Sequence, residues 1–83
     1  PYQTFATADG HLIIACGNDG QFARLCAVLG RAFHADPRFA TNEGRVGARA
    51  ELVPQLAAAI ATWPRDTLIA ALDKAGVPAG PIN

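Results

Sequence analysis

The sequence predicts an α+β fold in which an antiparallel β-hairpin packs on three main helices. Two strand-like segments flank Asp9-Gly10, and three later segments carry helix start and stop signals. The 83 residues suffice for one small domain. Because Ala supplies much of the 51% hydrophobic share, we expect a thin core built from Leu, Ile, Val and Phe.

The hairpin is predicted from residues 3–8 and 11–16. Asp9 and Gly10 tolerate the positive φ of a type I′ turn, which favours a tight connection between the two strands. The second strand, His-Leu-Ile-Ile-Ala-Cys, is apolar on both faces, so we expect it to be nearly buried on both sides. Helices of this chain cover one face, and the rest of a larger protein is expected to cover the other.

The first predicted helix begins after Asn18, a favourable N-cap, with Gln21 three residues later as in a capping box. Gly30 is a suitable stop. Asp36-Pro37 disfavours helix, so residues 32–35 are expected to form one short turn before a loop. The apolar stripe of the helix consists of Phe22, Leu25, Cys26 and Leu29. Phe33 and Phe39 are expected to anchor the loop to the core.

A short helix is predicted from Thr41-Asn42 through Val46, and a longer one over residues 49–62. Pro54 conflicts with the longer helix, because an interior proline costs about 3 kcal/mol. We therefore expect the regular helix to begin nearer residues 51–53 or to kink there.

The last predicted helix covers residues 65–75, with Pro64 at or near its first position. Gly76 and Val77 predict a Schellman-type stop in which Val77 returns to Leu72. The tail over residues 78–83 is either a linker or an edge strand.

Seven basic and seven acidic residues give a formal charge of zero. We expect no nucleic-acid binding, because phosphate neutralisation needs a basic patch. The densest group of charges, Arg38, Arg45 and Arg49 interleaved with Asp36, Glu43 and Glu51, is interpreted as an ordinary solvated face. The apolar runs are too short to span a bilayer, so no membrane partner is expected.

Cys16 and Cys26 lie in apolar patterns and are expected to be buried thiols, which favours a reducing cytoplasm. Neither cysteine has the short spacing to a histidine that a zinc site needs, so no metal is expected. The chain has no Ser and no evident pair of carboxylates for acid–base chemistry. The residues alone therefore assemble no active site.

Four segments occur in a recognisable order: Pro-Tyr-Gln-Thr-Phe-x-Thr-Ala-Asp-Gly at 1–10, Gly-Asn-Asp-Gly-Gln-Phe-x-Arg-Leu-Cys at 17–26, Asp-Pro-Arg-Phe-Ala-Thr-Asn at 36–42, and Ala-Gly-Val-Pro-x-Gly-Pro-Ile-Asn at 75–83. Together they resemble the family III CoA-transferases, which include formyl-CoA transferase, carnitine CoA-transferase and α-methylacyl-CoA racemase. The resemblance covers the whole chain. Ala48 departs from it, since an Asn is expected before Arg49, and this weakens that helix cap.

The resemblance implies that residues 1–83 are the small domain of a two-domain subunit, excised from a larger chain. The chain also lacks Met and begins at once in a strand-like segment. In this family two linkers join the small domain to a large Rossmann-like domain, and the subunit forms a homodimer. The transferases move CoA between carboxylic acids through intermediates on an Asp of the large domain, whereas the racemase uses a His/Asp pair there. We expect acyl-CoA as the parent's substrate, no covalently bound cofactor and no catalytic residue in this chain.

The family's cleft lies between the two domains, and Tyr2, Gln3 and Asn18 are the cleft candidates by their position. Two other classes remain open. One is a free-standing helical interaction module that uses the face of residues 52–60. The other is a small anion-binding domain at residues 18–20, where a helix N-terminus favours negative charge although Asn18 caps it and Asp19 repels an anion.

Overall fold

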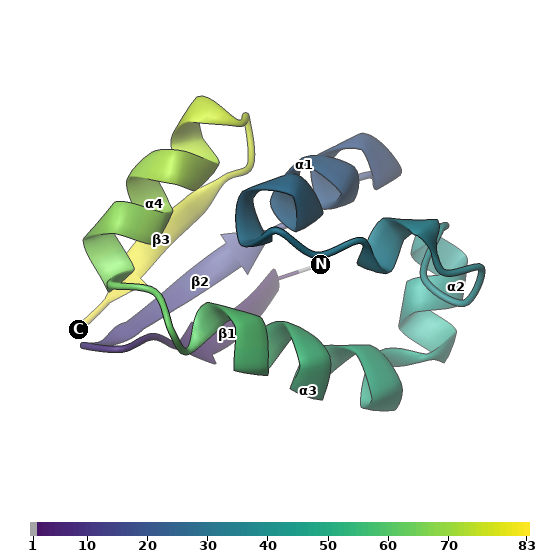
Figure 1. The fold of residues 1–83 in the computed structure, drawn as a ribbon, viewed down its shortest axis with the longest axis horizontal. Coiled ribbons are helices and arrows are strands. Elements are labelled where there is room, and N and C mark those ends of the chain that lie inside the picture. Colours follow the sequence, from purple (N-terminus) through teal and green to yellow (C-terminus); the bar gives the residue numbers. More distant parts are fainter. Residues whose placement is uncertain (1) are drawn as a thin grey trace.

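A three-stranded antiparallel sheet and four α-helices form the fold, so the α+β prediction is confirmed (Figure 1). The computed structural model describes residues 2–83, with side chains from residue 3 onward. The strand order is β1-β2-β3, in which the C-terminal tail is the edge strand β3 rather than a linker. The strands are β1 (Tyr2–Ala6), β2 (His11–Ala15) and β3 (Ala79–Ile82).

The helices cover one face of the sheet. α4 packs on β2 and β3, α3 packs on β1, and α1 contacts α4 (Figure 1). Leu12 and Ile14 of β2 are buried, whereas Ile13 between them is only partly covered. The helices of this chain thus cover one face of β2, as expected, and the expected cover of its other face by the rest of a larger protein stays a prediction. The helices are α1 (Asp19–Leu29), the 3₁₀ turn η1 (Phe33–Ala35), α2 (Asn42–Gly47), α3 (Arg49–Ile60) and α4 (Arg65–Lys74).

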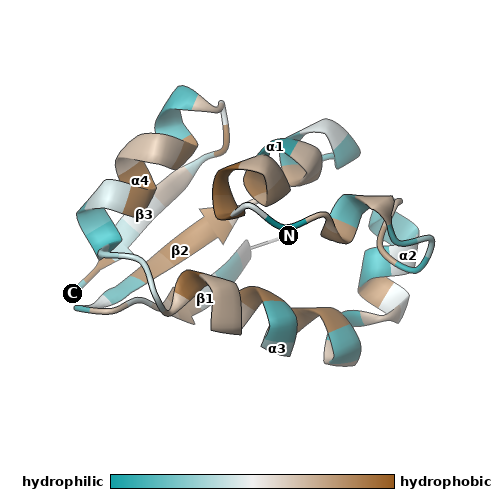
Figure 2. Ribbon diagram, viewed as in Figure 1, coloured by the Kyte–Doolittle hydropathy of each residue, from teal (hydrophilic) through white to brown (hydrophobic). Residues whose placement is uncertain are grey.

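One hydrophobic core lies between the sheet and the helices, and the prediction that Leu, Ile, Val and Phe dominate it is confirmed. Figure 2 shows β2 as hydrophobic along most of its length. The buried members are Phe5, Leu12, Ile14, Phe22, Leu25, Cys26, Phe33, Phe39, Leu52, Leu56, Ile60, Leu68, Leu72 and Val77.

The turn of the hairpin differs from the prediction. Ala6 pairs with His11, which leaves a four-residue loop at residues 7–10 in place of a two-residue turn. Thr7 N–H donates to the Gly10 carbonyl oxygen at 2.8 Å. Positive φ within residues 2–83 occurs only at two other glycines, so Gly10 does not adopt the type I′ conformation.

Tertiary contacts with the start of α4 explain the longer loop. The Asp9 carboxylate accepts the Arg65 backbone N–H at 2.8 Å, and Ala8 N–H donates to the Trp63 carbonyl oxygen at 2.9 Å. Asp9 thereby caps a helix that Pro64 cannot cap with a side chain. The loop therefore both joins β1 to β2 and caps α4.

The predicted helix ends of α1 are confirmed. Gln21 N–H donates to Asn18 Oδ1 at 2.8 Å, and Gly17 N–H donates to Gln21 Oε1 at 2.5 Å. Gly30 ends the helix with φ of 70°, a conformation that glycine adopts at little cost. These local hydrogen bonds fix where β2 stops and α1 begins.

The other helix signals are confirmed with one exception. Thr41 Oγ1 accepts Gly44 N–H at 3.0 Å and caps α2. Val77 N–H donates to Leu72 O at 2.9 Å in the predicted Schellman-type stop. α3, however, begins at Arg49 and runs through Pro54, so the expected later start is wrong. Pro54 has no N–H to donate to the carbonyl oxygen of Ala50. Because Ala50 is exposed, water can donate a hydrogen bond to that oxygen instead.

Candidate functional site

A groove of about 130 Å³ lies between the sheet and helices α1, α2 and α3. Most of its lining is apolar, and four polar side chains complete it. None of the described lining residues is an Asp or a Glu. The apolar members are Phe5, Ile14, Cys16, Phe22, Leu25, Val46, Leu52, Val53 and Leu56, and the polar members are Gln3, Asn42, Arg45 and Arg49.

Arg45 is buried at one side of the groove, with 9% of its surface exposed. Its Nη1 donates to the Phe39 carbonyl oxygen at 2.9 Å, and its Nη2 donates to Asp19 Oδ1 at 2.6 Å. Its guanidinium also lies 4.4 Å from the ring centroid of Phe22, a cation–π contact. The interpretation of Arg45 as part of a solvated face is therefore wrong. Arg45 ties α2 to the start of α1.

Arg49 and Gln3 meet across the groove. Arg49 is the first residue of α3, and its Nη2 donates to Oε1 of Gln3 on β1. The Gln3 amide nitrogen in turn donates to the Thr4 carbonyl oxygen at 3.3 Å, which leaves its oxygen directed at Arg49. A strand and a helix far apart in the sequence thus supply one polar contact at the groove.

The structure brings one of the three predicted cleft candidates to this groove. Gln3 lines it, whereas Asn18 is exposed outside it and is occupied in capping α1. The Tyr2 side chain lies outside the described side chains. Asp19, beside the predicted anion position, is paired with Arg45.

The two arginines of the groove are the residues that sequence reasoning missed. Arg45 lies in α2, and Arg49 is the first residue of α3. No local signal marks Arg45 as buried, because its partner Asp19 is 26 residues away in the sequence. A local charge pattern alone could not separate them from Arg38.

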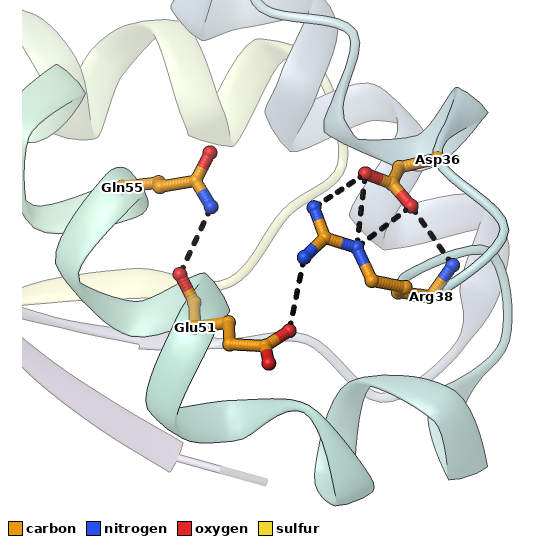
Figure 3. Close-up of polar contacts among 4 residues, drawn as sticks. All are labelled: Asp36, Arg38, Glu51 and Gln55. Carbon is orange, nitrogen blue, oxygen red and sulfur yellow. Dashed lines mark hydrogen bonds and ion pairs between the residues drawn. The ribbon is translucent and has the colours of Figure 1, made fainter.

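Arg38 does belong to a solvated face, as predicted. Its guanidinium contacts Asp36 Oδ2 at 2.8 Å and Glu51 Oε2 at 3.0 Å (Figure 3). The three side chains are 32–58% exposed. Hydrogen bonds from Arg38 lower the pKa of the Asp36 carboxyl. Gln55 donates to the Glu51 backbone carbonyl oxygen at 3.0 Å and extends this cluster along α3.

The two cysteines are free thiols, as predicted. Cys26 is buried in the core, as predicted, whereas Cys16 is only partly covered because it lies at the groove, so the expectation that it is buried is wrong. Burial raises the pKa of both thiols, so neither is activated as a nucleophile. Within residues 2–83, no three His, Cys, Asp or Glu side chains lie together as a candidate metal site.

Among the described residues, no helix has the length and apolar character needed to cross a membrane.

The sequence profile of CoA-transferase family III matches residues 1–83. Succinate–glutarate CoA-transferase of Agrobacterium fabrum is 46% identical over 84 residues, which cover 100% of this chain and 21% of that enzyme. Succinyl-CoA:glutarate CoA-transferase of Mus musculus is 40% identical and is covered over 19% of its length. A solved CAIB/BAIF family protein from Brucella suis superposes with a TM-score of 0.95 at 55% identity, over 100% of this chain and 22% of that protein.

The fold is thus that of a segment found in larger proteins of this family. The chain belongs to CoA-transferase family III. It spans about a fifth of the length of the relatives that it matches.

Proposed function

We propose that residues 1–83 are the small domain of a larger CoA-transferase subunit and form one wall of the cleft between its two domains. The observation that carries this proposal is the family match over the whole chain, together with a coverage of only about a fifth of each relative. The remainder of the subunit is proposed to contain the large Rossmann-like domain, and two subunits to form a homodimer, as the family resemblance implies.

The chemistry of the groove favours a non-catalytic role for this chain. CoA transfer in this family requires a carboxylate nucleophile, and the described part of the groove lining contains no carboxylate. The two thiols have raised pKa values and are poor nucleophiles at neutral pH. The residues that react with acyl-CoA are therefore assigned to the rest of the subunit.

The proposed reaction is transfer of CoA from an acyl-CoA thioester to a free dicarboxylate. The names of the two curated relatives include succinate or succinyl-CoA together with glutarate, and both describe transferases, which favours transfer over racemisation. The free thiols support a location in the reducing cytoplasm.

The test compares the subunit that carries this domain with the 83-residue chain alone. Both are incubated with succinyl-CoA and glutarate, and glutaryl-CoA is followed by chromatography. We expect turnover from the subunit and none above background from the isolated chain. Exchange catalysed by the isolated chain would contradict the proposed division of labour, and an inactive subunit would contradict the transfer function.

Two other classes of function gain no support from the structure. The face of residues 52–60 that an interaction module would present holds Leu52, Leu56 and Ile60, and all three are buried in the core. At residues 18–20, Asn18 caps the helix and Asp19 is paired.

A further inference from the structure

Two arginines line the groove, and only one of them has its charge balanced within residues 2–83. Arg45 is buried and paired with Asp19. Arg49 is exposed, and no described carboxylate lies within ion-pair distance of it. Glu51, two residues further along α3, binds Arg38 instead (Figure 3). The groove therefore carries one positive charge that no described side chain neutralises.

Helix stability does not explain the position of Arg49. It is the first residue of α3, and the positive end of the helix dipole disfavours a cation there. Its hydrogen bond goes to the neutral amide oxygen of Gln3, which orients the guanidinium without balancing its charge. An arginine has five N–H donors in a planar fork that matches a carboxylate. One donor is used by Gln3, and the others are available to a ligand.

The walls beside Arg49 are suited to a hydrocarbon chain. Val46 is 63% exposed although it is a large apolar residue, and Val53 and Cys16 are partly covered. A ligand with a short methylene chain and an anionic end would cover this apolar surface and place its charge at the guanidinium. A dicarboxylic acyl group has this chemistry, since one carboxyl group reacts with CoA and the other stays ionised.

We infer that Arg49 is a specificity-determining residue that binds the unreactive, distal carboxylate of a dicarboxylic substrate, with the methylene chain against the apolar wall of the groove. The inference rests on the proposed transfer of CoA to dicarboxylates. The distal carboxylate is present both in a free dicarboxylate and in its CoA thioester, so both sources are tested. Gln3 holds the guanidinium in place for this contact.

The experiment measures dissociation constants by calorimetry for the whole subunit and its Arg49→Gln variant. The ligands are glutaryl-CoA, valeryl-CoA, which has the same chain length without the distal carboxylate, and free glutarate. We expect R49Q to weaken glutaryl-CoA binding by about tenfold to a hundredfold, as the loss of a charged hydrogen bond predicts, and to leave valeryl-CoA binding unchanged. A parallel loss for free glutarate means that the site also binds the acceptor acid.

Two further variants give the matched controls. Arg24→Gln removes an exposed arginine outside the groove and is expected to change none of the three constants. Arg49→Lys keeps the charge but loses the fork, and we expect it to retain part of the preference for glutaryl-CoA. Retained binding of valeryl-CoA shows that each variant is folded.

Equal effects of R49Q on glutaryl-CoA and valeryl-CoA, or no effect on either, would overturn the inference. The transfer function is tested separately. If Arg49 confers the preference but the unmodified subunit transfers no CoA, the carboxylate site stands and the proposed function fails. If transfer occurs and R49Q keeps the preference, the proposed function stands and the role of Arg49 fails.

Discussion

Two arginine clusters on neighbouring segments show how burial, rather than the number of contacts, decides what an ion pair does. Arg38 makes several hydrogen bonds to Asp36 and one to Glu51, yet its side chain is 53% exposed. Arg45 makes two hydrogen bonds, and its side chain is 9% exposed. Water competes for the first cluster and salt screens it, whereas the guanidinium of Arg45 is buried and lies over the ring of Phe22. The Arg38 cluster lies on the surface, whereas the Arg45 cluster positions α2, which lines the groove.

The largest predicted effect comes from breaking the buried cluster. Arg45→Met keeps the aliphatic stem but leaves the Phe39 carbonyl oxygen without its donor. We expect the free energy of unfolding of the 83-residue chain to fall by about 2 kcal/mol, measured by urea denaturation. Arg24→Met, the same change at an exposed site, is the control and should leave the midpoint unchanged. Equal losses for the two variants would show that burial does not distinguish these arginines.

A smaller effect is expected from the partner of Arg45. Asp19 is 56% exposed, so Asp19→Asn should cost about 1 kcal/mol through the weakened ion pair and the lost negative charge in the first turn of α1. The double variant R45M/D19N should lose less stability than the sum of the two single losses, because the two residues share one ion pair. Strictly additive losses in the urea midpoints would contradict the pairing.

The smallest effect is expected in the exposed cluster, and it should depend on pH. Because Arg38 lowers the pKa of Asp36, its carboxylate contributes stability above its unfolded pKa of about 3.9, and the contribution is lost as the pH falls through the lower folded pKa. Asp36→Asn should therefore lower the urea midpoint slightly at pH 7, and by less as the pH falls below about 3.9. At pH 7, added salt should shrink the difference. A difference that grows towards low pH would contradict the assigned direction.

The same contrast explains how much of the molecule could be predicted from its sequence. The ends of α1 and the stop after α4 were predictable because Asn18, Gly30 and Gly76 act on residues within one turn of themselves. The burial of Arg45 was not, because it depends on Asp19, 26 residues away. Likewise, the hairpin loop depends on a partner in α4 that no local rule connects with Asp9.

The candidate site was harder to predict than the fold. The place of Gln3 in the chain predicts a residue of the cleft between two domains, and in the described chain Gln3 lines the groove. The groove itself is made by two strands and three helices, so its shape exists only after they pack. The sequence does not distinguish Arg49 from other surface charges, because its partner Gln3 is 46 residues away and meets it only in the folded chain.

The contact between Asp9 and the start of α4 also bears on how the domain folds. The two residues that it joins are 56 positions apart, and β3, at the end of the chain, completes the sheet against β2. Closing such long loops costs entropy before the contacts repay it, which slows folding relative to a purely local topology. During synthesis, the hairpin of β1 and β2 is therefore made before its partners. One edge of β2 has no neighbouring strand until β3 is made, and the hairpin loop has no contact with α4 until that helix forms. The sheet becomes complete only when the last residues of the domain have left the ribosome.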